Sequence, residues 1–271
     1  MKTIAHIINP VVVNSSSDLY IAQPVTFESM RVAKETARNF VEVKLYSAQF
    51  EEDASLVPDF ILKTPDLNKS ILDYGKFENK KKLPLLHEIL EKLYQNTDAE
   101  YLIYTNVDIA LLPNFYREID GFIQRGYDSF VINRRTISSK YENPKQLPEM
   151  YKDPGKKHPG YDCFIFKRKI YPKLILENIV VGSNWVGWSF LTNLICFSRK
   201  MKIFDNLHLT FHIGEERIWK SAKFDDYSQF NYRQYKIISE KLESEIGKLA
   251  KYIKHFKVLG LIKFIKTLKY L

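Results

Sequence analysis

The stretch Tyr101-Leu-Ile-Tyr-Thr-Asn106-Val-Asp108 is the most informative part of the chain. Residues Tyr101–Thr105 predict a buried strand, and the short oxygen-bearing side chains of Asn106 and Asp108 follow it directly. In an open α/β sheet such residues lie at the carboxyl edge, where these folds bind ligands. Their oxygens suit hard cations such as Mg²⁺ or Mn²⁺, which are usually held by one or two carboxylates plus substrate phosphates. The alternative is that Asp108 only caps the following turn.

Strand-like and helix-like segments alternate around this stretch, as in βαβ units. Predicted strands cover Thr3–Val13, Val41–Tyr46, Tyr101–Thr105, Ser129–Asn133, Asp162–Phe166 and Lys202–Ile213. Predicted helices cover Val25–Asn39, the region of Leu85–Leu93, the segment after Pro113, Ile170–Asn178 and Trp185–Ser198. Irregular connections are expected over Ser47–Asn79 and Arg134–Pro159. The fold class is therefore α/β, with a mostly parallel sheet flanked by helices.

Composition narrows the class of protein. The chain has 271 residues, of which 45% are apolar, enough for one substantial core and too many for a disordered or disulfide-stapled protein. Its two cysteines, Cys163 and Cys196, cannot form a disulfide framework or a cysteine-only zinc site, and they fit a reducing cytoplasm. No apolar run approaches the roughly 18 residues of a membrane-spanning helix. We therefore expect a cytoplasmic protein.

The net charge of +9 is concentrated at the C-terminus, because Lys248–Leu271 holds seven lysines and no acidic residue. On a helical wheel its apolar side chains lie opposite these lysines, with a bend at Gly260. This basic amphipathic tail predicts binding to an anionic membrane surface rather than to nucleic acid. The alternative is a helix packed on the body of the protein or on a second subunit of a homo-oligomer. We divide the chain into an α/β domain, 1–225, and a helical tail, 226–271.

The apolar strand ending in Asn106-Val-Asp108 resembles the Asp-x-Asp motif of GT-A-type glycosyltransferases of the bacterial cell-envelope polysaccharide type. By element order the resemblance covers residues 1–220. It implies a nucleotide-diphosphate sugar of the UDP type as donor, and Mn²⁺ or Mg²⁺ held by Asp108 and Asn106 with His212 completing the metal shell. The chain departs from the family at Asn106, which replaces the first Asp and removes one charge from the metal site.

Two further segments belong to the second half of the chain. Pro159-Gly-Tyr-Asp162 precedes an apolar strand, and the resemblance implies that Asp162 is the general base if the enzyme inverts the anomeric centre. Such a group typically contributes ~10²- to 10⁴-fold in rate. The alternative is a turn Asp that bonds its own backbone. Of the indoles in Trp185-Val-Gly-Trp188, we expect Trp185 to line the pocket and Trp188 to join the core.

The resemblance also places the nucleotide beside several residues of the first half. Asn9 and Pro10 end the first strand, whose loop would line the base. Lys82 opens a helix near the nucleotide, although a lysine run is also typical of a solvated face. The guanidinium of Arg134, which follows a predicted strand, suits a diphosphate.

These features predict a glycosyltransferase that moves a sugar from a nucleotide-diphosphate sugar to a hydroxyl of a glycan or lipid-linked glycan, at the inner face of the cell membrane. Two alternatives remain open. A sugar-nucleotide-forming nucleotidyltransferase would carry a Gly-rich basic loop after its first strand, where this chain has Asn14–Asp18. A non-enzymatic membrane or nucleic-acid adaptor would use its tail alone.

Overall fold

The computed structural model describes residues 2–214 and 225–250. Its large sheet contains β1 (Thr3–Ile8), β2 (Glu42–Ser47), β3 (Leu62–Lys63), β4 (Tyr101–Thr105), β6 (Ser129–Ile132), β9 (Cys163–Lys167) and β10 (Met201–Phe204). A smaller sheet contains β5 (Ala110–Leu111), β7 (Arg135–Ile137), β8 (Lys156–Lys157) and β11 (Thr210–Ile213). The α-helices are α1 (Leu19–Ala37), α2 (Leu86–Asn96), α3 (Phe115–Gln124), α4 (Leu147–Met150), α5 (Val186–Phe197) and α6 (Asp225–Ala250).

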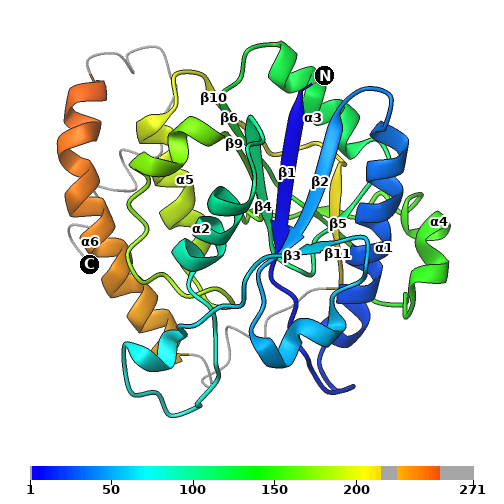
Figure 1. Cartoon of the computed structure of the whole chain (residues 1–271), viewed down its shortest axis with the longest axis horizontal. Helices are drawn as coiled ribbons and strands as arrows, with labels where there is room; N and C mark the ends of the chain where they lie inside the picture. Colours follow the sequence, from blue (N-terminus) through cyan, green and yellow to red (C-terminus); the bar gives the residue numbers. More distant parts are fainter. Residues whose placement is uncertain (1, 215–224, 251–271) are drawn as a thin grey trace.

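The large sheet has the order β10-β6-β9-β4-β1-β2-β3, and helices lie on both of its faces (Figure 1). All of its pairings are parallel except those of β9, which runs antiparallel to both β4 and β6. The predicted α/β fold with a mostly parallel sheet is therefore confirmed. The carboxyl ends of the parallel strands and the amino end of β9 share one edge of the sheet.

Alternation along the strands divides the core into two layers. In β1, Ile4 and Ile8 face one layer, while Ala5 and Ile7 face the other. The first layer is filled by α1 and α3, through buried side chains such as Phe27, Met30, Phe115 and Phe122. The second layer is filled by α2 and α5, through Leu86, Leu90, Phe190 and Leu194. The result is a three-layer sandwich of helices, sheet and helices.

Several predicted boundaries are corrected by the structure. The first strand ends at Ile8 rather than Val13, because Pro10 has no N–H to donate to a neighbouring strand. The first helix begins at Leu19 and runs through Pro24, whose missing N–H leaves only one carbonyl unpaired, near the helix start. The predicted strand Lys202–Ile213 is two strands, β10 and β11, which belong to different sheets.

The region Arg134–Pro159 was expected to be irregular, but it contains β7, β8, a 3₁₀ turn η3 (Pro144–Gln146) and α4. These elements are too short to show a period in the sequence. The expected helix Ile170–Asn178 is a 3₁₀ helix, η4 (Arg168–Lys173), with Pro172 inside it. The connection Ser47–Asn79 is mainly irregular and holds η1 (Glu51–Leu56), β3 and η2 (Ile71–Asp73).

Helix α6 begins ten residues before Tyr235, where the sequence pattern first becomes clearly helical. Its Ile238 and Leu242 are fully buried in the same core layer as α2 and α5. Asn231 donates to Val180 O and accepts from Val180 N–H, which fixes the start of the helix on the body. The predicted domain boundary at 225/226 falls at the first residue of α6, and most of the predicted membrane-binding segment falls within 251–271, outside the described residues. Within the part that is described, no helix combines the length and apolar character needed to cross a bilayer.

His6 is fully buried in β1, between the hydroxyls of Tyr116 at 2.8 Å and Thr105 at 2.9 Å. Burial lowers the pKa of His6 to about 3, from an ordinary value near 6.5. Below pH 6.5 the unfolded chain therefore gains a proton that the folded chain does not. We predict that this residue alone lowers the free energy of unfolding by about 2 kcal/mol between pH 7.5 and pH 5.

Urea unfolding of wild type and His6→Gln at these two pH values measures the effect. The loss on acidification should be smaller in the variant by that amount, because glutamine does not titrate. An equal loss in both proteins would show that His6 is not held neutral by the fold.

Candidate functional site

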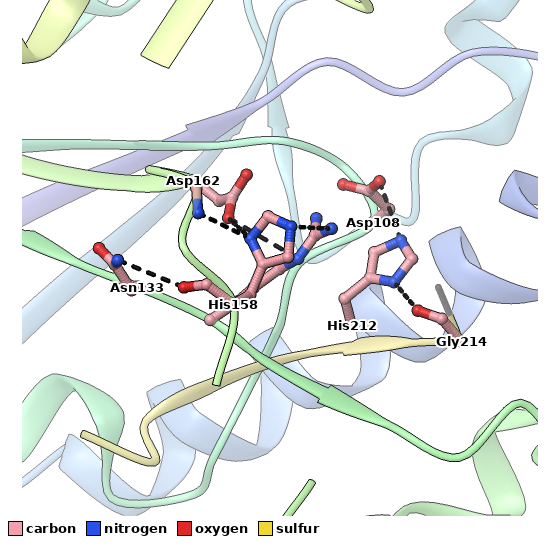
Figure 2. Close-up of polar contacts among 8 residues, drawn as sticks. Asp108, Asn133, His158, Asp162, His212 and Gly214 are labelled. Atoms are coloured by element: carbon pink, nitrogen blue, oxygen red, sulfur yellow. Dashed lines mark hydrogen bonds and ion pairs between the residues drawn. The ribbon is translucent and has the colours of Figure 1, made fainter. Parts of the chain in front are cut away.

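Strand register brings Asp108 and His212 together at the carboxyl edge of the sheet. Asp108 follows β4 and precedes β5, whose Ala110 pairs with Phe211 of β11. His212 is the next residue of β11, and its Nε2 lies 3.3 Å from Asp108 Oδ2. Both side chains are almost completely buried, with 0% and 11% of their surface exposed. The predicted pairing of these two residues is thus present in the structure, and Figure 2 shows it as one of two polar clusters.

The hydrogen bond on the far side of the ring fixes how His212 faces Asp108. Nδ1 lies 2.8 Å from Gly214 O, and because a carbonyl oxygen only accepts, Nδ1 carries the proton. In the neutral ring the lone pair of Nε2 then points at a carboxylate oxygen. Two acceptors at this distance repel each other unless a cation lies between them or the ring is protonated. A histidine oriented through Nδ1–H to a backbone carbonyl is also the usual arrangement of metal ligands.

The electrostatics of Asp108 favour its charged form. Burial raises the pKa of Asp108, but the hydrogen bond and charge of His212, together with the charge of Arg134, outweigh burial and hold the pKa below its ordinary value. The second carboxylate oxygen, Oδ1, is buried and has no hydrogen-bond partner among the described residues. A buried carboxylate oxygen without a partner is costly, so it marks a position suited to a ligand or cation.

Asn106 lies two residues before Asp108 at the same sheet edge. Its Oδ1 accepts a hydrogen bond of 2.9 Å from the hydroxyl of Tyr104, the last buried tyrosine of β4. A carboxamide oxygen has two lone pairs, so one remains for a second partner. Among the described residues no three His, Cys, Asp or Glu side chains form a metal-binding group. The chain therefore offers Asp108 and His212, with the neutral Asn106 as a weaker third oxygen donor.

Asp162 forms the second cluster with Arg134 and His158. Its Oδ2 lies 3.7 Å from Arg134 Nε and 3.6 Å from His158 Nδ1. His158 Nδ1 also accepts a 3.0 Å hydrogen bond from Gly160 N–H, and its Nε2 lies 3.5 Å from an Arg134 amino group. Asp162 Oδ2 and Arg134 Nε are buried without a hydrogen bond among the described residues, so the charge of Arg134 holds the carboxylate while the ring of His158 lies against it.

The other predicted site residues have varied positions. Asn9 donates to Ala48 O at 2.7 Å, which joins the carboxyl ends of β1 and β2. Pro10 is buried beside it. Lys82 Nζ lies 2.7 Å from Glu52 Oε1 and 4.2 Å above the ring of Phe50, so it covers the loop after β2.

Trp185 stacks on Tyr235 of α6 with ring centroids 5.1 Å apart, so its indole is used in a helix contact. Trp188 is half-buried and packs against the core, as expected, and it also meets the ring of Tyr161 edge-on at 5.2 Å, next to Asp162 in the sequence.

His158 is the residue that the sequence analysis missed. It stands four positions before Asp162, in His-Pro-Gly-Tyr-Asp, within a segment interpreted as a polar loop. The sequence offered one sign of it, a glycine two residues after His158. The structure explains this glycine, because an added Cβ at Gly160 would lie 2.5 Å from His158 Cε1. A glycine between a histidine and an aspartate permits this close approach of ring and backbone.

With this geometry established, comparison with known proteins defines the fold. No family model and no curated protein matches the sequence. Among solved structures, the chain is similar to S. aureus TarS 1–349 in complex with UDP-GlcNAc, with a TM-score of 0.50 and 9% identity over 86% of this chain and 66% of that one. The same protein in complex with UDP gives 0.50 and 8%, over 88% and 65%. The chain has a GT-A-like α/β fold.

The likeness to TarS concerns the backbone, since at 8–9% identity it establishes no shared activity. The chain also spans slightly less than two thirds of the length of the TarS structures.

Proposed function

We propose that the chain is a metal-assisted glycosyltransferase that moves a sugar from a nucleotide-diphosphate sugar to a hydroxyl of a glycan or lipid-linked glycan. The observation that carries the proposal is the buried contact of 3.3 Å between Asp108 and His212, with the Asp162 cluster beside it at the same sheet edge. The loop Asn14–Asp18 lacks the Gly-rich basic character expected of a nucleotidyltransferase, and an adaptor requires neither cluster. The fold shared with TarS, whose structures hold UDP-GlcNAc and UDP, favours a UDP-type donor.

Asp108 and His212 would hold the Mn²⁺ or Mg²⁺, with the remaining lone pair of Asn106 as a third protein ligand. The fit rests on the orphaned Oδ1 of Asp108, which is buried beside the ring of His212 and which a cation would satisfy. When bound, the cation supplies Lewis-acid neutralisation of the departing diphosphate. The positive charge of Arg134, which acts on Asp108 as well as Asp162, faces the same diphosphate.

Asp162 would act as general base on the acceptor, with inversion at the anomeric carbon. As the acceptor oxygen forms its bond to that carbon, its proton passes to Asp162, and the bond to the diphosphate breaks with both electrons leaving on the phosphate oxygen. The charge of Arg134 holds the carboxylate in place, and the ring of His158 packs beside it. Preorganised positioning of this kind reduces the cost of reaching the transition state.

The nucleotide would lie over the carboxyl ends of β1, β2 and β4, beside Asn9 and Pro10, with Lys82 above the loop after β2. To meet a phosphate or the base, Lys82 would exchange its ion pair with Glu52, a small cost because both side chains are about half exposed. The partly exposed Trp185, whose ring stacks on Tyr235 of α6, would line the same donor site with its other face.

We further propose that the protein acts in the cytoplasm at the inner face of the membrane, bound through the basic tail of residues 248–271. The support is the charge pattern of the sequence, seven lysines opposite an apolar face. Anchoring to anionic lipid would place the active site close to a lipid-linked acceptor.

Calorimetric titration with UDP-, GDP-, CDP- and dTDP-sugars, in Mn²⁺ and in EDTA, tests the proposed function. One nucleotide class should bind in Mn²⁺, and its affinity should fall about 100-fold or more in EDTA. The absence of binding to every nucleotide sugar would favour the adaptor alternative.

Gly160 provides a test of the base cluster that does not alter its ionisable groups. In Gly160→Ala the new methyl would meet His158 Cε1 at 2.5 Å and Nδ1 at 2.9 Å, so the partly exposed ring must move away from Asp162. We predict a roughly ten- to hundredfold lower kcat with donor binding preserved, because displacement of a positioning group by about 1 Å costs on that order.

The matched control is Gly121→Ala in α3, where an added Cβ meets no atom within 4 Å. It should leave both kcat and donor binding as in wild type. A kcat for Gly160→Ala equal to that of Gly121→Ala would show that the position of His158 does not matter for transfer.

A further inference from the structure

A cavity of about 600 Å³ lies next to Asp162, outside the proposed metal and nucleotide positions. Its volume is within the range of pockets that hold small organic ligands. The polar and aromatic side chains that line it are Asn133, Lys157, His158, Tyr161 and Asp205. His158 belongs to both the cavity wall and the Asp162 cluster, so the cavity opens beside the proposed base.

Sheet topology places this cavity on the opposite side of Asp162 from the proposed donor site. Asp162 precedes β9, whose Cys163 pairs with Thr105 of β4 on one side and with Ile132 of β6 on the other. Asn9, Asn106 and Asp108 of the proposed donor site follow β1 and β4, whereas Asn133 follows β6 and Asp205 follows β10. Arg134 also follows β6, but its side chain reaches back to Asp162. Figure 2 shows the same order, with Asp108 and Asn133 on opposite sides of Asp162 and His158.

The wall of the cavity matches a hydroxylated, uncharged ring. Asn133 is 95% buried, and its Nδ2 is directed to His158 O at 3.4 Å while its Oδ1 has no hydrogen-bond partner among the described residues. That oxygen is an acceptor suited to a ligand hydroxyl. Tyr161 offers a ring held edge-on by Trp188, which suits the apolar face of a sugar. The exposed Lys157 and Asp205 carry opposite charges, so the lining has no net charge.

We propose that this cavity is the acceptor pocket and that it takes a neutral sugar or polyol, with the reacting hydroxyl directed at Asp162. The proposal rests on the proposed glycosyltransferase function and adds the location and chemical class of the acceptor. Tyr161 and Asp205 determine which acceptor binds, and Asn133 accepts a hydrogen bond from one of its hydroxyls.

Saturation-transfer difference NMR on the full chain without nucleotide tests the pocket directly. The probes are methyl β-glucoside, methyl β-galactoside, the methyl glycoside of N-acetylglucosamine, ribitol, and glucose 6-phosphate as a charged counterpart. At least one neutral probe should receive saturation, and Tyr161→Ala should reduce that signal at least about fivefold. Asp205→Ala, at an exposed position that folding does not depend on, should also reduce it.

Tyr20→Ala and Asp59→Ala, two exposed positions outside the cavity, are the matched controls and should keep the wild-type signal. No transfer to any neutral probe, transfer only to glucose 6-phosphate, or an undiminished signal in Asp205→Ala would each overturn the proposal. Because no nucleotide is present, these outcomes are separate from the calorimetric test of the donor site. If the chain binds nucleotide sugars but no neutral probe, the acceptor-pocket proposal fails and the proposed donor site stands.

Discussion

Asp162→Asn should lower kcat by ~10²- to 10⁴-fold while leaving the KM for the donor nearly unchanged, because the variant keeps the shape of the side chain but cannot accept the proton of the acceptor hydroxyl. The substitution leaves Arg134, 3.7 Å from the carboxylate, in place with its charge available for the diphosphate, so donor binding should change little. The measurement is release of nucleoside diphosphate with a neutral sugar as acceptor.

Asp59→Asn is the control for this experiment, since Asp59 is exposed and distant in sequence from both clusters. It should retain full activity. Transfer by Asp162→Asn at the control rate would remove Asp162 from the mechanism, while a parallel loss of donor affinity would mean that the residue serves the donor instead.

Asp108→Asn should reduce the affinity for the nucleotide sugar in Mn²⁺ by about 100-fold or more, down to the level measured in EDTA. Loss of an outer partner of a metal ligand already costs about 10- to 100-fold, and here a charged ligand itself is lost. Because Asn106 is neutral, Asp108 is the only carboxylate of the Asn-x-Asp motif, so the variant leaves the motif without charge. Calorimetry in Mn²⁺ and in EDTA gives both values.

In EDTA the variant and wild type should bind the nucleotide equally, which separates loss of the metal from collapse of the site. Equal affinities of the two proteins in Mn²⁺ would show that Asp108 holds no cation and would leave it the role of a buried partner of His212.

The fold was predictable where a segment is long enough to show a clear apolar pattern. Tyr101–Thr105 is a strand with the predicted bounds. Five consecutive apolar or hydroxyl-bearing residues between polar ends are typical of a short buried strand and too few for a helix. The elements β7, β8 and α4 were not predictable, because two to four residues cannot display a period and their stability comes from pairing with distant strands. The predicted helix Val25–Asn39 omitted the first turns of α1, which continue through Pro24.

The sequence predicted the two carboxylates of the candidate site, Asp108 and Asp162, better than it predicted the residues that contact them. The contact between Asp108 and His212 could be expected only from the family resemblance, since register between β5 and β11 is not visible in one sequence. Arg134 was assigned to the diphosphate, and the structure places it 3.7 Å from Asp162, within reach of both clusters. The sequence did not predict His158, because its position beside Asp162 depends on a turn in which His158 Nδ1 accepts a hydrogen bond from Gly160 N–H.

The most direct test of the central claim is pulsed electron paramagnetic resonance of Mn²⁺ bound to the protein with UDP. If Asp108 and His212 hold the cation, the spectrum will show the ¹⁴N coupling of a directly bound imidazole. That coupling will be absent in His212→Gln and retained in His87→Gln, whose ring instead contacts Glu177 O. A spectrum of wild type without nitrogen coupling would contradict the account, because it would place the metal away from His212.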